Sequence, residues 1–132
     1  MPSTYSKATL IAAGLMLITL MVHVFAGGSD VHLPLLAETD NPGLAAFVSV
    51  LWHFVTLFLA VLCLGLVSLA RHPNPALEAA FCALQLGFAA LFLFYGTTRL
   101  GTVWLMPQWI VFLLVPALTR WGQSKAVVQS LS

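Results

Sequence analysis

Apolar residues dominate the chain in four long runs that are separated by short polar segments. A helix that crosses a membrane needs about 20 mostly apolar residues, because each residue adds about 1.5 Å along the hydrocarbon layer. Each run approaches or exceeds this length, which predicts membrane helices over about residues 8–26, 42–70, 76–96 and 101–119. No run alternates with the period of two that a barrel strand requires.

Polar and turn-forming residues mark the ends of these runs. Asp40 or Asn41 is suited to cap the second helix, with Pro42 in the first turn, where its missing N–H does no harm. Residues 71–75 contain two prolines, which disfavour helix in the residue before them and predict a tight reversal. Two glycines follow the first run, so residues 27–41 are expected to form the longest loop.

The composition indicates a membrane protein and excludes several function classes. Of 132 residues, 61% are hydrophobic and 7% are charged, whereas a soluble domain has about 45–50% and about 25%. A net charge of +1 provides no basic surface for a nucleic-acid backbone. The sequence therefore predicts one all-α domain over residues 1–132, a four-helix transmembrane bundle in contact with lipid and without a nucleic-acid partner.

The cations predict the orientation of this bundle. Lys7, Arg71, Arg120 and Lys125 fall on one side of the predicted membrane, and Arg99 falls on the other. The side richer in lysine and arginine faces the cytoplasm. Both termini are therefore expected in the cytoplasm (N-in/C-in) of a bacterial inner (plasma) membrane. Because the first run is as long as a full span, we expect it to be retained rather than cleaved as a signal peptide.

Each predicted helix carries a stripe of polar or small residues at helical spacing. A polar side chain that faces lipid costs free energy, so these stripes are expected to face the bundle axis. Cys63 and Cys82 are interpreted as packing residues and not as a disulfide, because the cytoplasmic half is reducing. The stripes, in chain order of the helices, are Ala12, Met16, Thr19 and His23; His53, Thr56, Ala60 and Cys63; Glu78, Cys82, Gln85, Ala89 and Gly96; Trp104 and Gln108.

Histidines gather at the predicted outer end. His23 and His53 are at matching depth on inward stripes, and an ionisable residue inside a span is a functional candidate by default. Imidazole suits copper, zinc or iron, and carboxylates of the outer loop can complete the coordination sphere, although no local metal motif is present. A b-type haem held by His23 and His53 is a second cofactor hypothesis. The predicted metal ligands are His23, His53, His32, Glu38 and Asp40.

The same end also suits a ligand from the membrane, such as a quinone or a lipid headgroup. The aromatic candidates equally fit an interfacial belt, and Arg99 fits a side chain that reaches lipid phosphates. Pro107 is expected inside the fourth helix, where it would produce a kink beside Gln108. The predicted ligand-binding residues are Arg99, Gln108, Trp52, Trp104 and Tyr95.

Two classes of function follow from these patterns. In the first, the bundle binds a metal, haem, quinone or lipid through His23 and His53, with a redox or lipid-modifying reaction left open. In the second, it is a non-catalytic structural or accessory subunit that forms a homo-oligomer through Ala79, Ala83 and Gly87, since small residues let helices approach closely. No residue spacing of a soluble hydrolase or nucleotide enzyme is present.

Overall fold

The computed structural model describes the backbone of residues 5–131 and the side chains of residues 5–125. Within these residues every long element is a helix, and α1, η1 and α2 are continuous as a single helix over Lys7–Ala37. The helices over Lys7–Ala37, Pro42–Arg71 and Pro75–Leu100 are long and apolar enough to cross a membrane. The elements are α1 (Lys7–Val22), η1 (His23–His32), α2 (Leu33–Ala37), α3 (Pro42–Arg71), α4 (Pro75–Leu100) and α5 (Trp109–Leu131).

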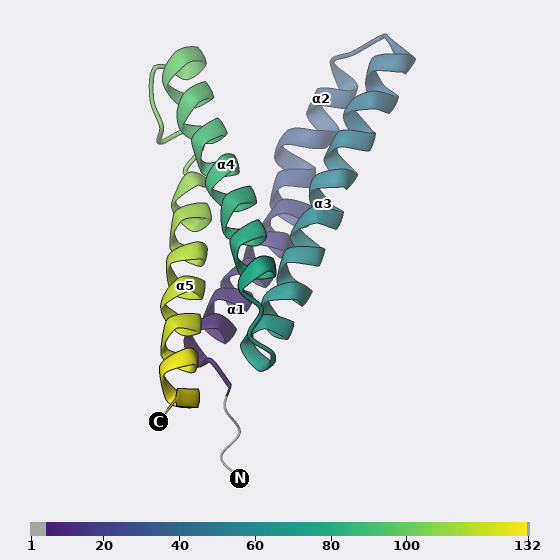
Figure 1. The fold of residues 1–132 in the computed structure, drawn as a ribbon. Coiled ribbons are helices and arrows are strands. Elements are labelled where there is room, and N and C mark those ends of the chain that lie inside the picture. The colour runs from purple at the N-terminus through teal and green to yellow at the C-terminus, as the bar shows by residue number, and fades with distance from the viewer. Residues whose placement is uncertain (1–4, 132) are drawn as a thin grey trace.

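The long helices form two hairpins that converge at one end of the molecule (Figure 1). The first hairpin pairs the α1–η1–α2 helix with α3, and the second pairs α4 with α5. Both ends of the chain and the α3–α4 turn lie at the convergent end, which we call the termini end. The α2–α3 turn and the α4–α5 connection lie at the opposite, distal end, where the two hairpins diverge.

Side-chain caps explain where three helices begin. Ser6, Asn41 and Asn74 precede α1, α3 and α4, and their side-chain oxygens accept hydrogen bonds of 3.0–3.3 Å from backbone N–H groups two or three residues later. Such caps satisfy N–H groups that have no partner inside the helix. The expected start of a helix at Pro42 is confirmed, with Asn41 as its cap.

The expected loop over residues 27–41 is wrong, because the first helix continues to Ala37. Its middle part, η1, is a π-helix, in which hydrogen bonds span five residues: the N–H of Leu33 donates to the carbonyl of Gly28. In a regular α-helix the ring of Pro34 would clash with the carbonyl of Asp30. The wider turn accommodates this proline. Most π-helices are single turns, often at functional sites, whereas η1 contains ten residues.

The expected boundary near residue 101 also moves. Helix α4 continues to Leu100 and ends at Gly101, whose φ of 68° is readily adopted only by glycine. Residues 102–108 form turns, and α5 begins at Trp109, whose indole N–H donates to the carbonyl of Val103 over 3.2 Å. Pro107 therefore precedes the helix, and the expected kink at this residue is wrong.

The predicted inward stripes are confirmed for α1 and α4, and only in part for α3, where Thr56 and Cys63 are half-buried and bond to residues of the first helix. The stripe of Trp104 and Gln108 is wrong, because both residues are exposed. Glu78, Gln85 and Ala89 are buried on α4, as are Ala12 and Met16 on α1. The buried stripe of α3 consists of leucines instead, and His53 is exposed. Dispersion and close packing thus decide the inner face of α3. Its buried leucines are Leu59, Leu62, Leu66 and Leu69.

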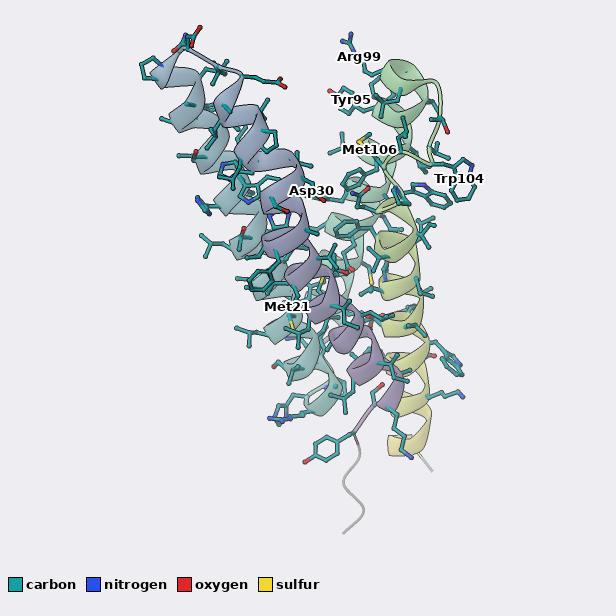
Figure 2. All side chains as sticks on the ribbon, turned by 180° about the vertical axis from the view of Figure 1, so that it is seen from behind. Met21, Asp30, Tyr95, Arg99, Trp104 and Met106 are labelled. Carbon is teal, nitrogen blue, oxygen red and sulfur yellow. The ribbon has the colours of Figure 1, made fainter. Side chains whose placement is uncertain are left out.

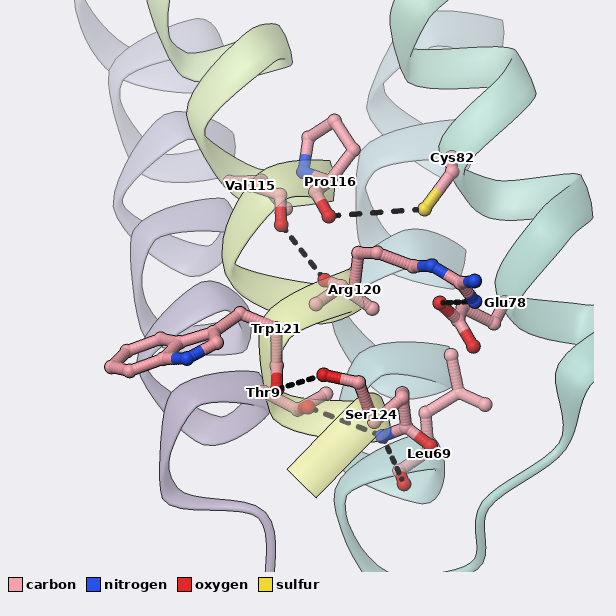
Figure 3. A network of polar contacts seen from close by, with 11 residues as sticks. Thr9, Leu69, Glu78, Cys82, Val115, Pro116, Arg120, Trp121 and Ser124 are labelled. Carbon is pink, nitrogen blue, oxygen red and sulfur yellow. Dashed lines mark hydrogen bonds and ion pairs between the residues drawn. The ribbon is translucent and has the colours of Figure 1, made fainter. Parts of the chain in front are cut away.

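Polar contacts join the helices at the termini end (Figure 3). The side-chain amide of Gln123 on α5 donates to the hydroxyl of Thr9 on α1 (3.2 Å) and to the carbonyl of Leu69 on α3 (3.0 Å). Arg120 on α5 pairs with the buried carboxylate of Glu78 on α4 at 3.2 Å. The bonds of Gln123 fix the two hairpins to each other where they converge, whereas the Arg120–Glu78 pair joins the two helices of the second hairpin.

Candidate functional site

Two histidines stack on Trp52 of the first hairpin, and a third, His53, packs against one of them. The imidazole of His23 stacks on the indole with ring centroids 4.2 Å apart, and the imidazole of His32 stacks on it at 5.0 Å with an interplanar angle of 3°. The indole edge approaches Gly27, where an added Cβ would lie 3.0 Å from the ring. Because Gly27 lies between the two histidines along η1, the indole lies between their rings.

The widened helix is what brings His23 and His32 to the same side. Nine residues separate them, which is about two and a half turns of an α-helix at about 3.6 residues per turn, so a regular helix would direct them to opposite faces. A π-helix has more residues per turn, and nine residues then return to nearly the same face. The backbone form of η1 therefore builds the stack around Trp52.

Hydrogen bonds hold two of the three imidazoles. A bond of 3.1 Å joins His23 Nε2 to the hydroxyl of Thr56, and the same nitrogen lies 3.4 Å from the carbonyl oxygen of Trp52. A longer bond of 3.4 Å joins His32 Nε2 to the hydroxyl of Ser49. His53 is exposed, its ring meets His32 edge-on at 5.8 Å, and it makes no hydrogen bond with the described side chains. His53 is thus the imidazole available to a ligand.

An open cleft of about 380 Å³ lies beside this cluster, between η1 and α3. Its lining combines apolar side chains with hydroxyl and imidazole groups, and it includes no lysine, arginine, aspartate or glutamate. The nearest carboxylate in sequence is Asp30, which accepts a hydrogen bond from the hydroxyl of Ser29 (2.8 Å). The lining residues are Val24, Phe25, Gly28, Ser29, His32, Leu33, Trp52, His53 and Thr56.

The predicted metal ligands are brought together only in part. His23 and His32 stack on Trp52 and His53 contacts His32, but His23 Nε2 already bonds to Thr56. Glu38 follows the end of α2, six residues or about 9 Å of helix beyond His32. Among the described residues, no group of three or more histidine, cysteine, aspartate or glutamate side chains is arranged to hold a metal ion.

The predicted ligand-binding residues are divided between the hairpins. Trp52 lies in the cleft, whereas Tyr95 and Arg99 are exposed near the distal end of α4. Figure 2 shows these two side chains across the gap from Asp30 of η1, with Trp104 in the α4–α5 connection. Gln108 is exposed in the same connection. The structure therefore places one member of the predicted set at the cleft.

Sequence reasoning gave His32 a place in a loop and missed its burial. The side chain is 9% exposed, since the helix continues and presents it to Trp52. A signal for this arrangement exists in the pair Gly27 and Gly28, one of which permits the indole to approach. Ser29, Val24 and Phe25 were also missed as lining residues.

Comparison with known proteins supplies no precedent for this site. The chain matches no protein-family model, and comparisons with curated proteins and with solved structures give no significant match. The chemistry of the cleft is therefore argued from its own side chains.

Adjacent glycines in η1 offer a test of the packing around Trp52. An alanine methyl at Gly27 would crowd the indole, so Gly27→Ala is expected to destabilise the protein by about 1 kcal/mol, the cost of overpacking less the gain in helix propensity. At Gly28 nothing lies within 4 Å, and Gly28→Ala should stabilise by up to about 1 kcal/mol. Denaturation followed by circular dichroism measures both effects. Equal effects at the two positions would show that Gly27 does not contact Trp52.

Proposed function

We propose that this protein is an integral membrane protein that binds a small amphipathic molecule of the bilayer, a quinone or a lipid headgroup, in the cleft beside His32 and His53. The observation that carries the proposal is the cleft itself, which is lined by an exposed imidazole, hydroxyl groups and apolar side chains. A redox or lipid-modifying reaction at this cleft stays a prediction of the sequence.

The proposed membrane position follows from length and charge. In the proposal the protein crosses a bacterial inner membrane with both termini in the cytoplasm. Lys7 begins α1, Arg71 ends α3, and Arg120 and Lys125 lie in the C-terminal part of α5, so all four cations are toward the termini end. A span of about 20 residues from Arg71 reaches residue 51. Trp52 and His53 then lie at the outer interface, where lipid headgroups and the heads of amphipathic ligands are found.

Two features of the site support binding in particular. His53 is exposed beside the buried His32, and its imidazole makes no hydrogen bond with the described side chains, so it can bond to a ligand. The rare π-helix orders the adjacent wall, and such helices occur frequently at functional sites. An apolar wall with a few placed polar groups is typical of small-molecule sites.

The metal and haem hypotheses have less support from the geometry. The hydrogen bond to Thr56 occupies His23 Nε2, and the nitrogen would have to break this bond to bind a metal. The leucine stripe of α3, not an imidazole, faces the core. His23 and His53 are therefore not a pair of facing ligands across the bundle axis.

The binding proposal is tested by titrating protein in phosphatidylcholine nanodiscs with two probes, a decyl-benzoquinone and dioctanoyl phosphatidylglycerol. A variant that retains Trp52 as its one tryptophan reports binding through its fluorescence. We expect saturable binding of at least one probe, and His53→Phe should weaken it about tenfold through loss of one hydrogen bond. His72→Phe, at an exposed histidine after α3, is the matched control and should change nothing. If neither probe gives saturable, His53-dependent binding, the proposal is wrong.

A second candidate function is supported by the outer face of α4. Ala79, Ala83 and Gly87 are exposed, and nothing lies within 4 Å of a Cβ placed at Gly87. These small residues are not packed against another helix among the described residues. In this candidate function they form the contact of a homo-oligomer in a structural subunit.

This candidate predicts a stable oligomer in mild detergent that Gly87→Leu dissociates, because a leucine side chain prevents close approach of two helices. Gly14→Leu is the matched control, since Gly14 of α1 is equally open and lies outside this face. Light scattering coupled to size exclusion measures the mass of each variant. A monomeric wild-type protein, or an oligomer that survives Gly87→Leu, contradicts the candidate.

A further inference from the structure

We infer that the cleft selects an electrically neutral, planar head with carbonyl acceptors, the chemistry of a quinone, over the phosphate of an anionic lipid. This inference rests on the binding function proposed above and specifies the class of ligand. It follows from the charges, donors and shape of the cleft, which are taken in turn below.

The charges around the cleft disfavour an anionic head. None of its lining residues is a lysine or an arginine, the side chains that bind phosphate through charge-assisted hydrogen bonds. The neighbouring carboxylate of Asp30 would repel a phosphate. Arg99 lies on the other hairpin, across the gap that Figure 2 shows. An anion bound here would lose water without gaining a cationic partner from the lining.

The donors suit a carbonyl oxygen. A neutral imidazole carries one N–H donor and one acceptor nitrogen, and it can therefore bind a quinone carbonyl or a quinol hydroxyl without any charge. His53 makes no hydrogen bond with the described side chains, so its N–H is not committed to packing. The hydroxyl of Thr56, which also lines the cleft, already bonds to His23. His53 is therefore the expected partner of the head.

The shape suits one flat ring with an apolar tail. Trp52, His32 and His53 all line the cleft, and a quinone ring can meet the edges of the stacked rings or the ring of the exposed His53. The volume of about 380 Å³ is near the lower end of the range of about 300–1,000 Å³ for small-molecule sites. Phe25 is 70% exposed at the cleft and Val24 lies beside it in the lining, so an apolar tail can pack on these side chains on its way to the bilayer.

The test compares the two probes on one protein. In phosphatidylcholine nanodiscs at neutral pH, the variant with Trp52 as its one tryptophan is titrated with decyl-benzoquinone and with dioctanoyl phosphatidylglycerol. We expect the quinone to bind at least tenfold more tightly. Quenching by quinone dissolved in the bilayer does not saturate, so the linear part of each titration is subtracted. His72→Phe in this variant should leave both titrations unchanged.

A gain of anion binding provides the second measurement. Ser29 is exposed, so Ser29→Arg adds a cation to the cleft without disturbing the core. This variant should gain at least tenfold in affinity for phosphatidylglycerol and should change little toward the quinone. Tighter binding of phosphatidylglycerol than of quinone by the unsubstituted cleft would overturn the inference and leave the binding function in place. Binding of neither probe would overturn both.

Discussion

Gly65→Ala is expected to destabilise the protein by about 3 kcal/mol, at the upper end of the usual cost of overpacking. A Cβ placed at Gly65 of α3 would overlap the aromatic ring of Phe81 of α4. Phe81 is only 9% exposed, so its ring cannot turn outward without breaking other packing. Denaturant titration followed by circular dichroism measures the loss, and Gly14→Ala is the control in open surroundings.

A double-mutant cycle shows whether this contact is the cause. Phe81→Leu removes the ring that the new methyl group meets, so Gly65→Ala should cost less in the Phe81→Leu background than in the wild type. Residues in direct contact show coupling energies of about 0.5–3 kcal/mol, whereas distant sites are additive. We expect a coupling of at least about 1 kcal/mol. Strict additivity would mean that Gly65 and Phe81 do not pack together, and that the two hairpins meet differently.

Gly122→Ala is expected to have a similar effect at the termini end, where it would lower the free energy of unfolding by about 2–3 kcal/mol. A Cβ at Gly122 of α5 would overlap the hydroxyl groups of Ser6 and Thr9 and lie 3.0 Å from the backbone nitrogen of Thr9. These hydroxyls are buried and bonded to each other at 2.8 Å. Moving them apart would also strain the bond from Gln123 to Thr9.

The comparison variant for this position is Gly87→Ala, because it introduces the same methyl group into a helix where nothing lies within 4 Å. Helix propensity alone should make that substitution neutral or stabilising by up to about 1 kcal/mol. Thermal unfolding in detergent distinguishes the two. A Gly122→Ala protein as stable as Gly87→Ala would contradict the close approach of α1 and α5.

Both contacts belong to the half of the molecule that fixes one hairpin against the other. Aromatic rings add to this packing: Phe58 stacks on Phe88 with ring centroids 5.0 Å apart, and Phe112 packs against Phe88 at a tilt, with centroids 5.3 Å apart. Trp52 and the histidines stacked on it, His23 and His32, in contrast come from η1 and α3 alone. We therefore expect substitutions at Gly65 and Gly122 to lower overall stability while the cleft, if the protein still folds, keeps its shape.

Features that depend on local chemistry could be predicted from the sequence. The apolar runs predicted helices because a backbone in an apolar surrounding must satisfy its own hydrogen bonds. The cap at Asn41 and the turn near residues 71–75 were predicted because Asn and Pro act within a few residues. The polar stripe of α4 was predicted correctly, because the side chains of Glu78 and Gln85 turn away from lipid and are buried inside the protein.

The candidate site was predicted only at the level of its residue types. Histidines were expected at the distal end, but His32 was assigned to a loop and His53 to the inner face. The ring of His32 packs on Trp52 because Pro34 and the glycines of η1 permit a wider helix, which no α-helical periodicity anticipates. His53 is exposed because leucines with better packing occupy the inner face of α3.

The sequence alone determined the helical class, the limits of α3, the starts of α1 and α4 and the apolar surfaces, because each depends on residues that are neighbours along one segment. Only the tertiary structure decided which side of α3 faces inward, how far the hairpins diverge and which imidazole remains exposed. These depend on pairs such as Gly65 with Phe81 and Gly27 with Trp52. Whether such pairs meet depends on the relative position of whole helices. The spacing of residues within one segment does not specify that position.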